Sequence, residues 1–201
     1  MLSDSPKGIA PLAEARLGRI LKIVAKWLAY FGGVLLTAAA IMTIMSIAGR
    51  ALIWAGLGPI PGDFELVELT CAVAVFSFLP WSQINRGQVT VDVLVDTFPP
   101  RLRAGLGMAG DTAMAIAASV IAWRLWLGLG ERLPMGSDTL RTLLMLGDKP
   151  YYTETTFILR MPVWYGYALS MVGAAFFAVV CIYTVWRAVN WTIRGQEGPI
   201  V

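Results

Sequence analysis

The chain contains no histidine and only two cysteines among its 201 residues. Without histidine it cannot form a bis-histidine haem site, a histidine-ligated zinc site or a Ser-His-Asp triad. Cys71 and Cys181 both lie inside apolar runs, where a cysteine is first of all a small apolar side chain, and we expect no disulfide between them. A glycine-rich phosphate-binding loop is also missing. We therefore expect no cofactor, no metal site and no enzymatic activity.

Charged residues are scarce too, at 14% of the chain, whereas soluble domains carry about 25%. Apolar residues make up 57%, and the mean hydropathy is +0.67. Two runs, 27–49 and 161–186, contain no charged residue at all. At about 1.5 Å per helical residue, each run is longer than the roughly 30 Å hydrocarbon core of a bilayer. This composition predicts a membrane protein.

Two further apolar runs contain a few charged residues. Glu65 and Glu68 open the run at 64–84, and the run at 102–126 contains Asp111. We predict an all-α membrane protein with four spanning helices and short interfacial amphipathic helices. One membrane domain then covers 27–187, between an N-terminal segment at 1–26 and a tail at 188–201. A cleaved signal peptide explains the first run less well, because that run exceeds the roughly 7–15 apolar residues of such peptides.

Lysine and arginine predict the orientation, because cytoplasmic loops carry an excess of these residues. A cytoplasmic N-terminus places ten of them on the cytoplasmic side and six on the other side. We therefore expect both termini in the cytoplasm. The net charge of +3 then reflects attraction to anionic membrane lipids rather than to a nucleic-acid partner.

Segments outside the spans show amphipathic patterns. Residues 12–26 are either a helix along the inner leaflet or a basic flank that only sets the topology. The segment 89–98 has a valine alternation typical of a strand, but it also has a helical stripe. We prefer a short interfacial helix there, because an isolated strand at a membrane surface has no edge partner. In the third connection, Ser137 is a suitable N-cap for a short helix on the outer membrane face that ends at Gly147.

Acids at the start of the second span are the first candidate functional residues. Glu65 and Glu68 are three residues apart and share a helical face. One interpretation is an ion-coupling or proton site, because intramembrane acids are costly. We prefer a structural interpretation, because both lie in the first helical turns, where the helix dipole favours anions and Arg50 is a possible partner.

Asp111 lies deeper, inside the third span. It belongs either to a proton relay or to a contact with a partner helix or subunit, and we prefer the contact. Because the spans offer few polar groups at its depth, the expected partner is a group on the large subunit or a backbone amide exposed at a helix break. Arg124 is expected to extend to the outer interface. Tryptophans near the predicted span ends are expected to anchor the chain at the membrane interfaces; they are Trp27, Trp54, Trp81, Trp123, Trp126, Trp164 and Trp186.

The order of several short patterns resembles one known family. Residues 86–92 read Arg-Gly-Gln-Val-Thr-Val-Asp, and 99–101 follow as Pro-Pro-Arg. Together with the acidic start of the second span and Met-Pro-Val-Trp at 161–164, they resemble the small membrane subunit of tripartite ATP-independent periplasmic (TRAP) transporters, the DctQ-like family. The resemblance covers about 27–187. Gln88 departs from the histidine common in the family, and the third connection is long for it.

The resemblance implies partners and a function. Such a subunit associates with a large multi-spanning subunit that carries the substrate, usually an organic acid such as a dicarboxylate, together with sodium. A soluble periplasmic binding protein delivers the substrate. The small subunit is expected to brace the large one and to help dock the binding protein, in the bacterial inner membrane. Candidate interface or structural residues are Arg50, Glu65, Glu68, Asp92 and Asp111.

Two other functions remain open. A self-sufficient small transporter would use Glu65, Glu68 or Asp111 as its coupling group, and it would transport alone in liposomes. A four-span membrane enzyme would need catalytic polar groups clustered at one depth, and the sequence shows none.

Overall fold

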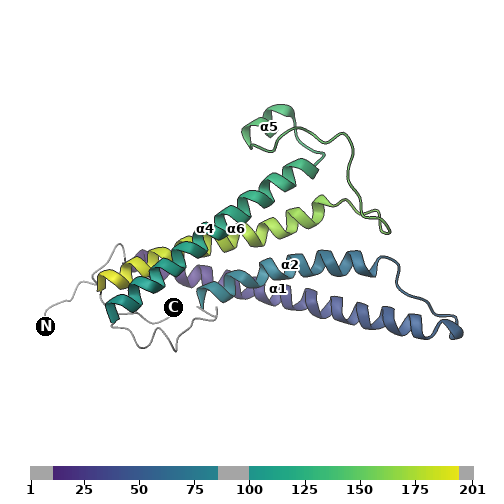
Figure 1. Ribbon diagram of the computed structural model, residues 1–201, viewed down its shortest axis with the longest axis horizontal. Coiled ribbons are helices and arrows are strands. Elements are labelled where there is room, and N and C mark those ends of the chain that lie inside the picture. The colour runs from purple at the N-terminus through teal and green to yellow at the C-terminus, as the bar shows by residue number, and fades with distance from the viewer. Residues whose placement is uncertain (1–10, 86–99, 195–201) are drawn as a thin grey trace.

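The computed structural model describes residues 11–85 and 100–194 (Figure 1). Over these residues the chain is all-α, and four of its helices are long and apolar enough to cross a membrane. They are α1 (Pro11–Ala51), α2 (Asp63–Ile84), α4 (Pro100–Arg132) and α6 (Trp164–Arg194). The connections hold a 3-10 turn, η1 (Ile53–Ala55), and a short helix, α5 (Asp138–Leu143). The prediction of an all-α fold with four spans is confirmed.

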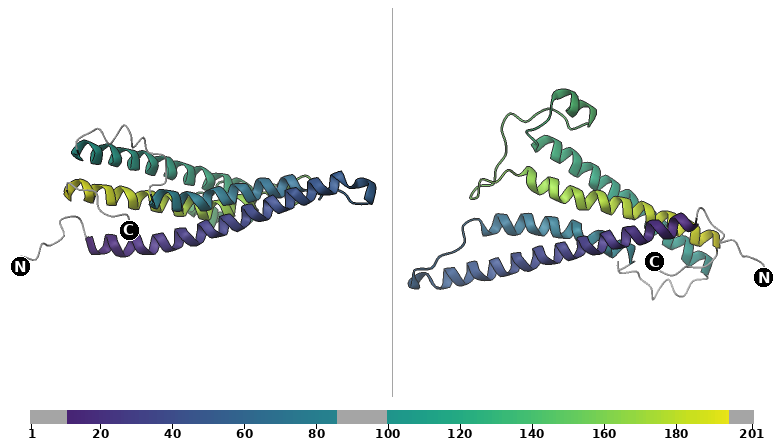
Figure 2. Two further views of the ribbon diagram at one scale, coloured as in Figure 1. Left: turned by 90° about the horizontal axis from the view of Figure 1, so that it is seen from below. Right: turned by 180° about the vertical axis from the view of Figure 1, so that it is seen from behind.

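The four long helices form two pairs. α1 packs along α2, α4 packs along α6, and the contact of α2 with α6 joins the pairs. We call the end where α1 begins and α6 ends the terminal end, and the opposite end the loop end. The pairs diverge towards the loop end in Figure 1, and α6 lies between α4 and α1 at the terminal end in the left view of Figure 2.

The apolar core lies around α6. In its most apolar stretch 44% of the residues are buried, against 17–22% in the other three spans. One buried cluster joins α1, α2 and α6 and consists of Leu21, Ala25, Ile84, Val180 and Tyr183. A second joins α4 to α6 and consists of Ala118, Phe177 and Cys181. The other helices therefore keep wide apolar faces that point out of the chain.

The contact between α2 and α6 depends on one glycine. Pro80 lies inside α2 and has no N–H, so the carbonyl of Phe76 loses its intrahelical donor. Gly173 of α6 packs directly against that carbonyl, and a Cβ on this residue would lie 2.7 Å from the oxygen. The missing side chain is what allows the two backbones to approach.

Several boundaries differ from the predicted ones. α1 runs unbroken from Pro11, so the segment 12–26 is not a separate helix along a leaflet but the first part of the first span's helix. No proline follows Pro11 within this helix, and nothing in the sequence forces a break. α4 and α6 both extend beyond the predicted spans, to Arg132 and Arg194. The segment 89–98, and with it Asp92, lies outside the described residues.

The third connection contains the predicted short helix. Ser137 is its N-cap and accepts a hydrogen bond from the backbone N–H of Leu140, as expected. The helix ends at Leu143, before the predicted stop at Gly147, which adopts a φ of +71° in the turn that follows.

Candidate functional site

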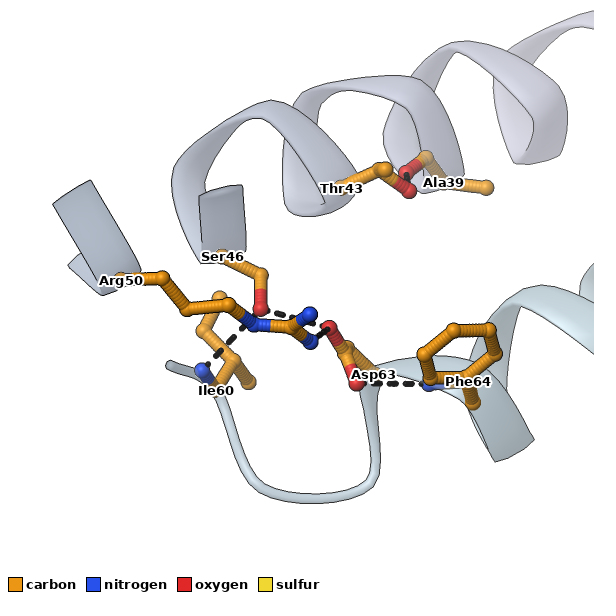
Figure 3. A network of polar contacts seen from close by, with 7 residues as sticks. All are labelled: Ala39, Thr43, Ser46, Arg50, Ile60, Asp63 and Phe64. Atoms are coloured by element: carbon orange, nitrogen blue, oxygen red, sulfur yellow. Dashed lines mark hydrogen bonds and ion pairs between the residues drawn. The ribbon is translucent and has the colours of Figure 1, made fainter. Parts of the chain in front are cut away.

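An ion pair at the loop end joins the end of α1 to the start of α2 (Figure 3). Asp63 Oδ2 accepts hydrogen bonds from Arg50 Nη2 at 2.7 Å and from Ser46 Oγ at 2.5 Å. The Ser46 oxygen in turn accepts from the backbone N–H of Ile60 at 3.3 Å. The predicted pairing of Arg50 with Glu65 or Glu68 is wrong, because the first residue of α2 lies nearest to the end of α1. Sequence reasoning missed Asp63, although it stands directly before the apolar run.

Glu65 binds the third connection instead. Its Oε1 accepts a hydrogen bond from the backbone N–H of Ile158 at 2.6 Å, and its Oε2 accepts one from Leu159 at 2.9 Å. The carboxylate thus holds the segment before α6 against the first turn of α2. These contacts favour the structural interpretation of Glu65, and a 93-residue separation in sequence kept them out of reach of pattern analysis.

Glu68 is exposed and, among the described residues, makes no ion pair. It borders a cavity of about 380 Å³ between α2, α4, α6 and the third connection. Its wall includes Glu65, Glu68, Phe76, Leu125, Tyr167 and Ser170. Most of this wall is apolar, so the two acids lie at the edge of a space that offers few further ligands to an ion.

The α4–α6 pair has its own polar contacts at the loop end. The Nε atom of Arg132 lies 3.2 Å from a carboxylate oxygen of Glu154, and its guanidinium lies over the ring of Tyr167 at 4.6 Å. Arg132 therefore connects the end of α4 both to the third connection and to α6. Arg124, about two helical turns earlier on α4, is exposed.

A polar network, buried at Gln83 and Thr184 and half-buried at Asp111, joins three helices near the terminal end. Gln83 Nε2 of α2 donates to Thr184 Oγ1 of α6 at 3.0 Å and to Asp111 Oδ1 of α4 at 3.4 Å. Asp111 thus contacts a partner helix, as preferred, but the expectation that this partner belongs to the large subunit or is a backbone amide is wrong, because the side chain of Gln83 supplies it. Sequence reasoning did not single out Gln83, which lies in the last turn of α2, level with Asp111 on the antiparallel α4.

α6 contributes a further buried polar set. Arg187 is fully buried and donates to the carbonyl of Ile84 at 3.2 Å, and its guanidinium lies 5.1 Å from the ring of Trp191. Asn190 donates to Glu14 of α1 at 2.7 Å. Sequence reasoning missed these residues because it treated Arg187 as the cytoplasmic end of the span. The spacing of Tyr183, Thr184, Arg187, Asn190 and Trp191 on one helical face was the available signal.

The predicted tryptophan anchors have different surroundings. Trp27 and Trp54 are exposed, whereas Trp81 and Trp186 pack against the core cluster of α1, α2 and α6. Trp126 donates through its indole N–H to the carbonyl of Leu144 at 2.9 Å, and the ring of Trp164 lies 4.3 Å from that of Tyr165. Their role as membrane-interface anchors stays a prediction.

The fold and these contacts define a four-helix, multi-pass membrane protein whose polar side chains bind its own helices and connections. Within residues 11–85 and 100–194, no three His, Cys, Asp or Glu side chains lie close enough together to hold a metal ion. A family model for the DctQ component of tripartite ATP-independent periplasmic transporters matches residues 39–190, and the chain belongs to this family. It is therefore a transporter component and not an enzyme. No curated protein and no solved structure matches the chain significantly.

Proposed function

We propose that this TRAP small permease subunit braces a large transport subunit and does not itself carry solute. The observation that carries the proposal is the contrast between its interior and its surface. Glu65, Asp111 and Gln83 make hydrogen bonds to other groups of this chain. The outward faces are apolar instead, with Val34 and Ile44 of α1 exposed by 68% and 66% and Ile116 of α4 by 62%. Such faces suit packing against another membrane subunit.

The finer parts of the proposal follow from the family. The complete system takes up an organic acid, such as a dicarboxylate, driven by an ion gradient that we propose is sodium. A periplasmic binding protein delivers the substrate, and the loop end of this subunit faces it on the periplasmic side of the bacterial inner membrane. The excess of Lys and Arg on the side of the termini supports this orientation.

Reconstitution tests the bracing role. The purified chain alone in liposomes should show no sodium-driven uptake of an organic acid, whereas the chain with the large subunit and the binding protein should show it. Omission of only this chain from the complete system should abolish uptake. Uptake by the chain alone would contradict the proposal and support a self-sufficient transporter.

A topology experiment tests the orientation. A reporter that is active only in the cytoplasm should be active when fused after Val201 and inactive when inserted at Gly136. The reverse pattern would place the loop end in the cytoplasm and would remove the proposed docking of the binding protein.

A further inference from the structure

One buried guanidinium organises the irregular segment that follows α4. Arg141 of α5 is only 2% exposed, and six backbone carbonyls lie 2.6–3.3 Å from its guanidinium nitrogens. Its five N–H groups serve all six, because two of the carbonyls share one N–H of Nη2. The acceptors are the carbonyls of Gly130, Leu133, Met135, Leu146, Gly147 and Asp148. No carboxylate of the described residues pairs with it. We call residues 133–148, which this side chain holds together, the Arg141 cap.

The Arg141 cap has its polar and apolar groups reversed relative to a water-exposed helix. Its arginine points inward, whereas Leu140, Leu143, Leu144 and Met145 are exposed by 46–76%. A short helix in water buries its leucines and leaves its arginine in solvent. The opposite arrangement suits a neighbour that is itself apolar.

Much of the backbone in and beside the cap is hydrogen-bonded from within the chain. Carbonyls at the end of a helix and in an irregular loop normally bond to water. A lipid neighbour cannot replace that water, so irregular backbone near hydrocarbon must be satisfied from within the protein. The six bonds from Arg141 supply this for the end of α4 and both sides of α5.

The cap is also continuous with the outward face of a membrane span. Figure 1 shows α5 folded back beside the loop end of α4. Trp126 of α4 holds the cap there through its bond to the Leu144 carbonyl, and Gly130 leaves no room for a Cβ beside Leu146. One and two turns earlier on α4, Trp123 and Val120 are exposed by 52% and 55%. The exposed leucines of the cap add to the apolar surface that Trp123 and Val120 form on α4.

We propose that the Arg141 cap is a lipid-binding module, which inserts Leu140, Leu143, Leu144 and Met145 into the boundary between headgroups and acyl chains of the leaflet at the loop end. Arg141 acts as a positioning residue, because it holds the turns on both sides of α5 together and satisfies six carbonyls in and beside the cap. Lipid is favoured over a protein partner because a protein surface could itself donate to those carbonyls, whereas acyl chains cannot. This inference does not depend on the transport function.

Spin labels at two positions of α5 test the inference. In the full chain with Cys71→Ala and Cys181→Ala, a nitroxide is placed at Leu143→Cys or, as the matched control, at Asp138→Cys. Collision rates with oxygen and with a water-soluble nickel chelate are then measured in phosphatidylcholine vesicles. The label at 143 should collide mainly with oxygen, at a depth of about 5–10 Å below the headgroups, and the label at 138 mainly with nickel. Nickel-dominated collisions at 143 would overturn the proposal.

The same labels distinguish a lipid from a protein neighbour. In the complex with the large subunit and the binding protein, the oxygen collisions at 143 should stay within about twofold of those of the chain alone. Loss of both oxygen and nickel collisions on assembly would show that a protein covers the leucines and would overturn the lipid assignment.

Arg141 variants test the positioning role. Lysine keeps the charge but has only three donors on one nitrogen, so Arg141→Lys and Arg141→Met should both move the label at 143 from oxygen-dominated to nickel-dominated collisions. Arg132→Lys, which changes a neighbouring arginine outside the cap, should leave the label unchanged. An unchanged signal in both Arg141 variants, with helix content preserved, would show that the guanidinium does not position the cap.

Discussion

The two ends of the helix bundle use polar side chains in different ways. At the terminal end, Gln83, Asp111 and Thr184 bond side chain to side chain across three helices, in a buried setting. At the loop end, Glu65 and Arg141 bond to backbone groups of the third connection instead. The terminal end therefore joins helices of both pairs through their side chains. At the loop end, Arg50 and Arg132 join helices within one pair, and other polar side chains hold the connections in shape while the pairs diverge.

This difference between the two ends fits a subunit that braces a partner and does not carry ions itself. Hydrogen bonds between membrane helices stabilise by about 0.6 kcal/mol on average, so no single bond at the terminal end fixes the bundle. Close backbone packing, as between Gly173 and Phe76, has to contribute as well. A rigid terminal end with preformed loops can hold a partner subunit in place without moving charge across the membrane.

The largest expected effect lies where the two helix pairs meet. Gly173→Ala puts a methyl group against the Phe76 carbonyl and should separate α2 from α6. We expect it to destabilise the chain by about 1–3 kcal/mol, as overpacking of a tight contact does. Equilibrium unfolding in mixed detergent micelles measures this.

Gly33→Ala is the matched control, because a Cβ at Gly33 meets nothing within 4 Å. It should leave stability unchanged or raise it, by up to about 1 kcal/mol. Equal destabilisation by both alanines would mean that the α2–α6 contact is not the joint between the pairs.

A smaller effect is expected for the buried network. A double-mutant cycle of Gln83→Leu and Asp111→Leu should give a coupling of about 0.6 kcal/mol, with about 1.7 kcal/mol as the upper bound seen for such bonds. Asp111→Leu should also co-purify with the large subunit at wild-type yield, since its partner lies in this chain. Zero coupling together with lost co-purification would show that Asp111 contacts the large subunit rather than Gln83.

The smallest effect is expected at the loop-end ion pair. Arg50 is 48% exposed, so solvent screens its attraction to Asp63. Asp63→Asn should lower the melting temperature less than either change above, and the loss should shrink further at high salt. Glu68→Gln, which removes an exposed acid without an ion pair, should not change the melting temperature. A salt-independent loss larger than that of Gly173→Ala would place the main joint at the loop end.

Local features of this chain were predictable from the sequence. The four spans follow from uncharged or nearly uncharged runs, and the Ser137 cap follows from a local motif. The spans and the N-cap each depend only on residues close together in the chain, so the sequence pattern predicts them directly. The resemblance to the DctQ family rested in the same way on short runs in a fixed order, and it is confirmed.

Contacts distant in sequence were not predictable. Glu14 meets Asn190 across 176 residues, and Glu65 meets Ile158 across 93. The burial of Arg187 was not predictable either, because a rule that ends spans at charged residues cannot foresee a guanidinium buried against a carbonyl and aromatic rings. The choice of Asp63 over Glu65 as the partner of Arg50 depends on the path of the 52–62 connection, which has no repetitive pattern.

The most direct test of the central claim is the sodium-to-substrate ratio of the assembled transporter. It is measured from paired tracer fluxes in proteoliposomes, with Glu65→Gln, Glu68→Gln and Asp111→Asn introduced one at a time and the assembled fraction normalised by size-exclusion chromatography. If these acids hold the subunit's own structure, the ratio should equal that of the wild type in all three variants, even where assembly falls. A lower ratio with intact assembly in any variant would show that the small subunit carries ions.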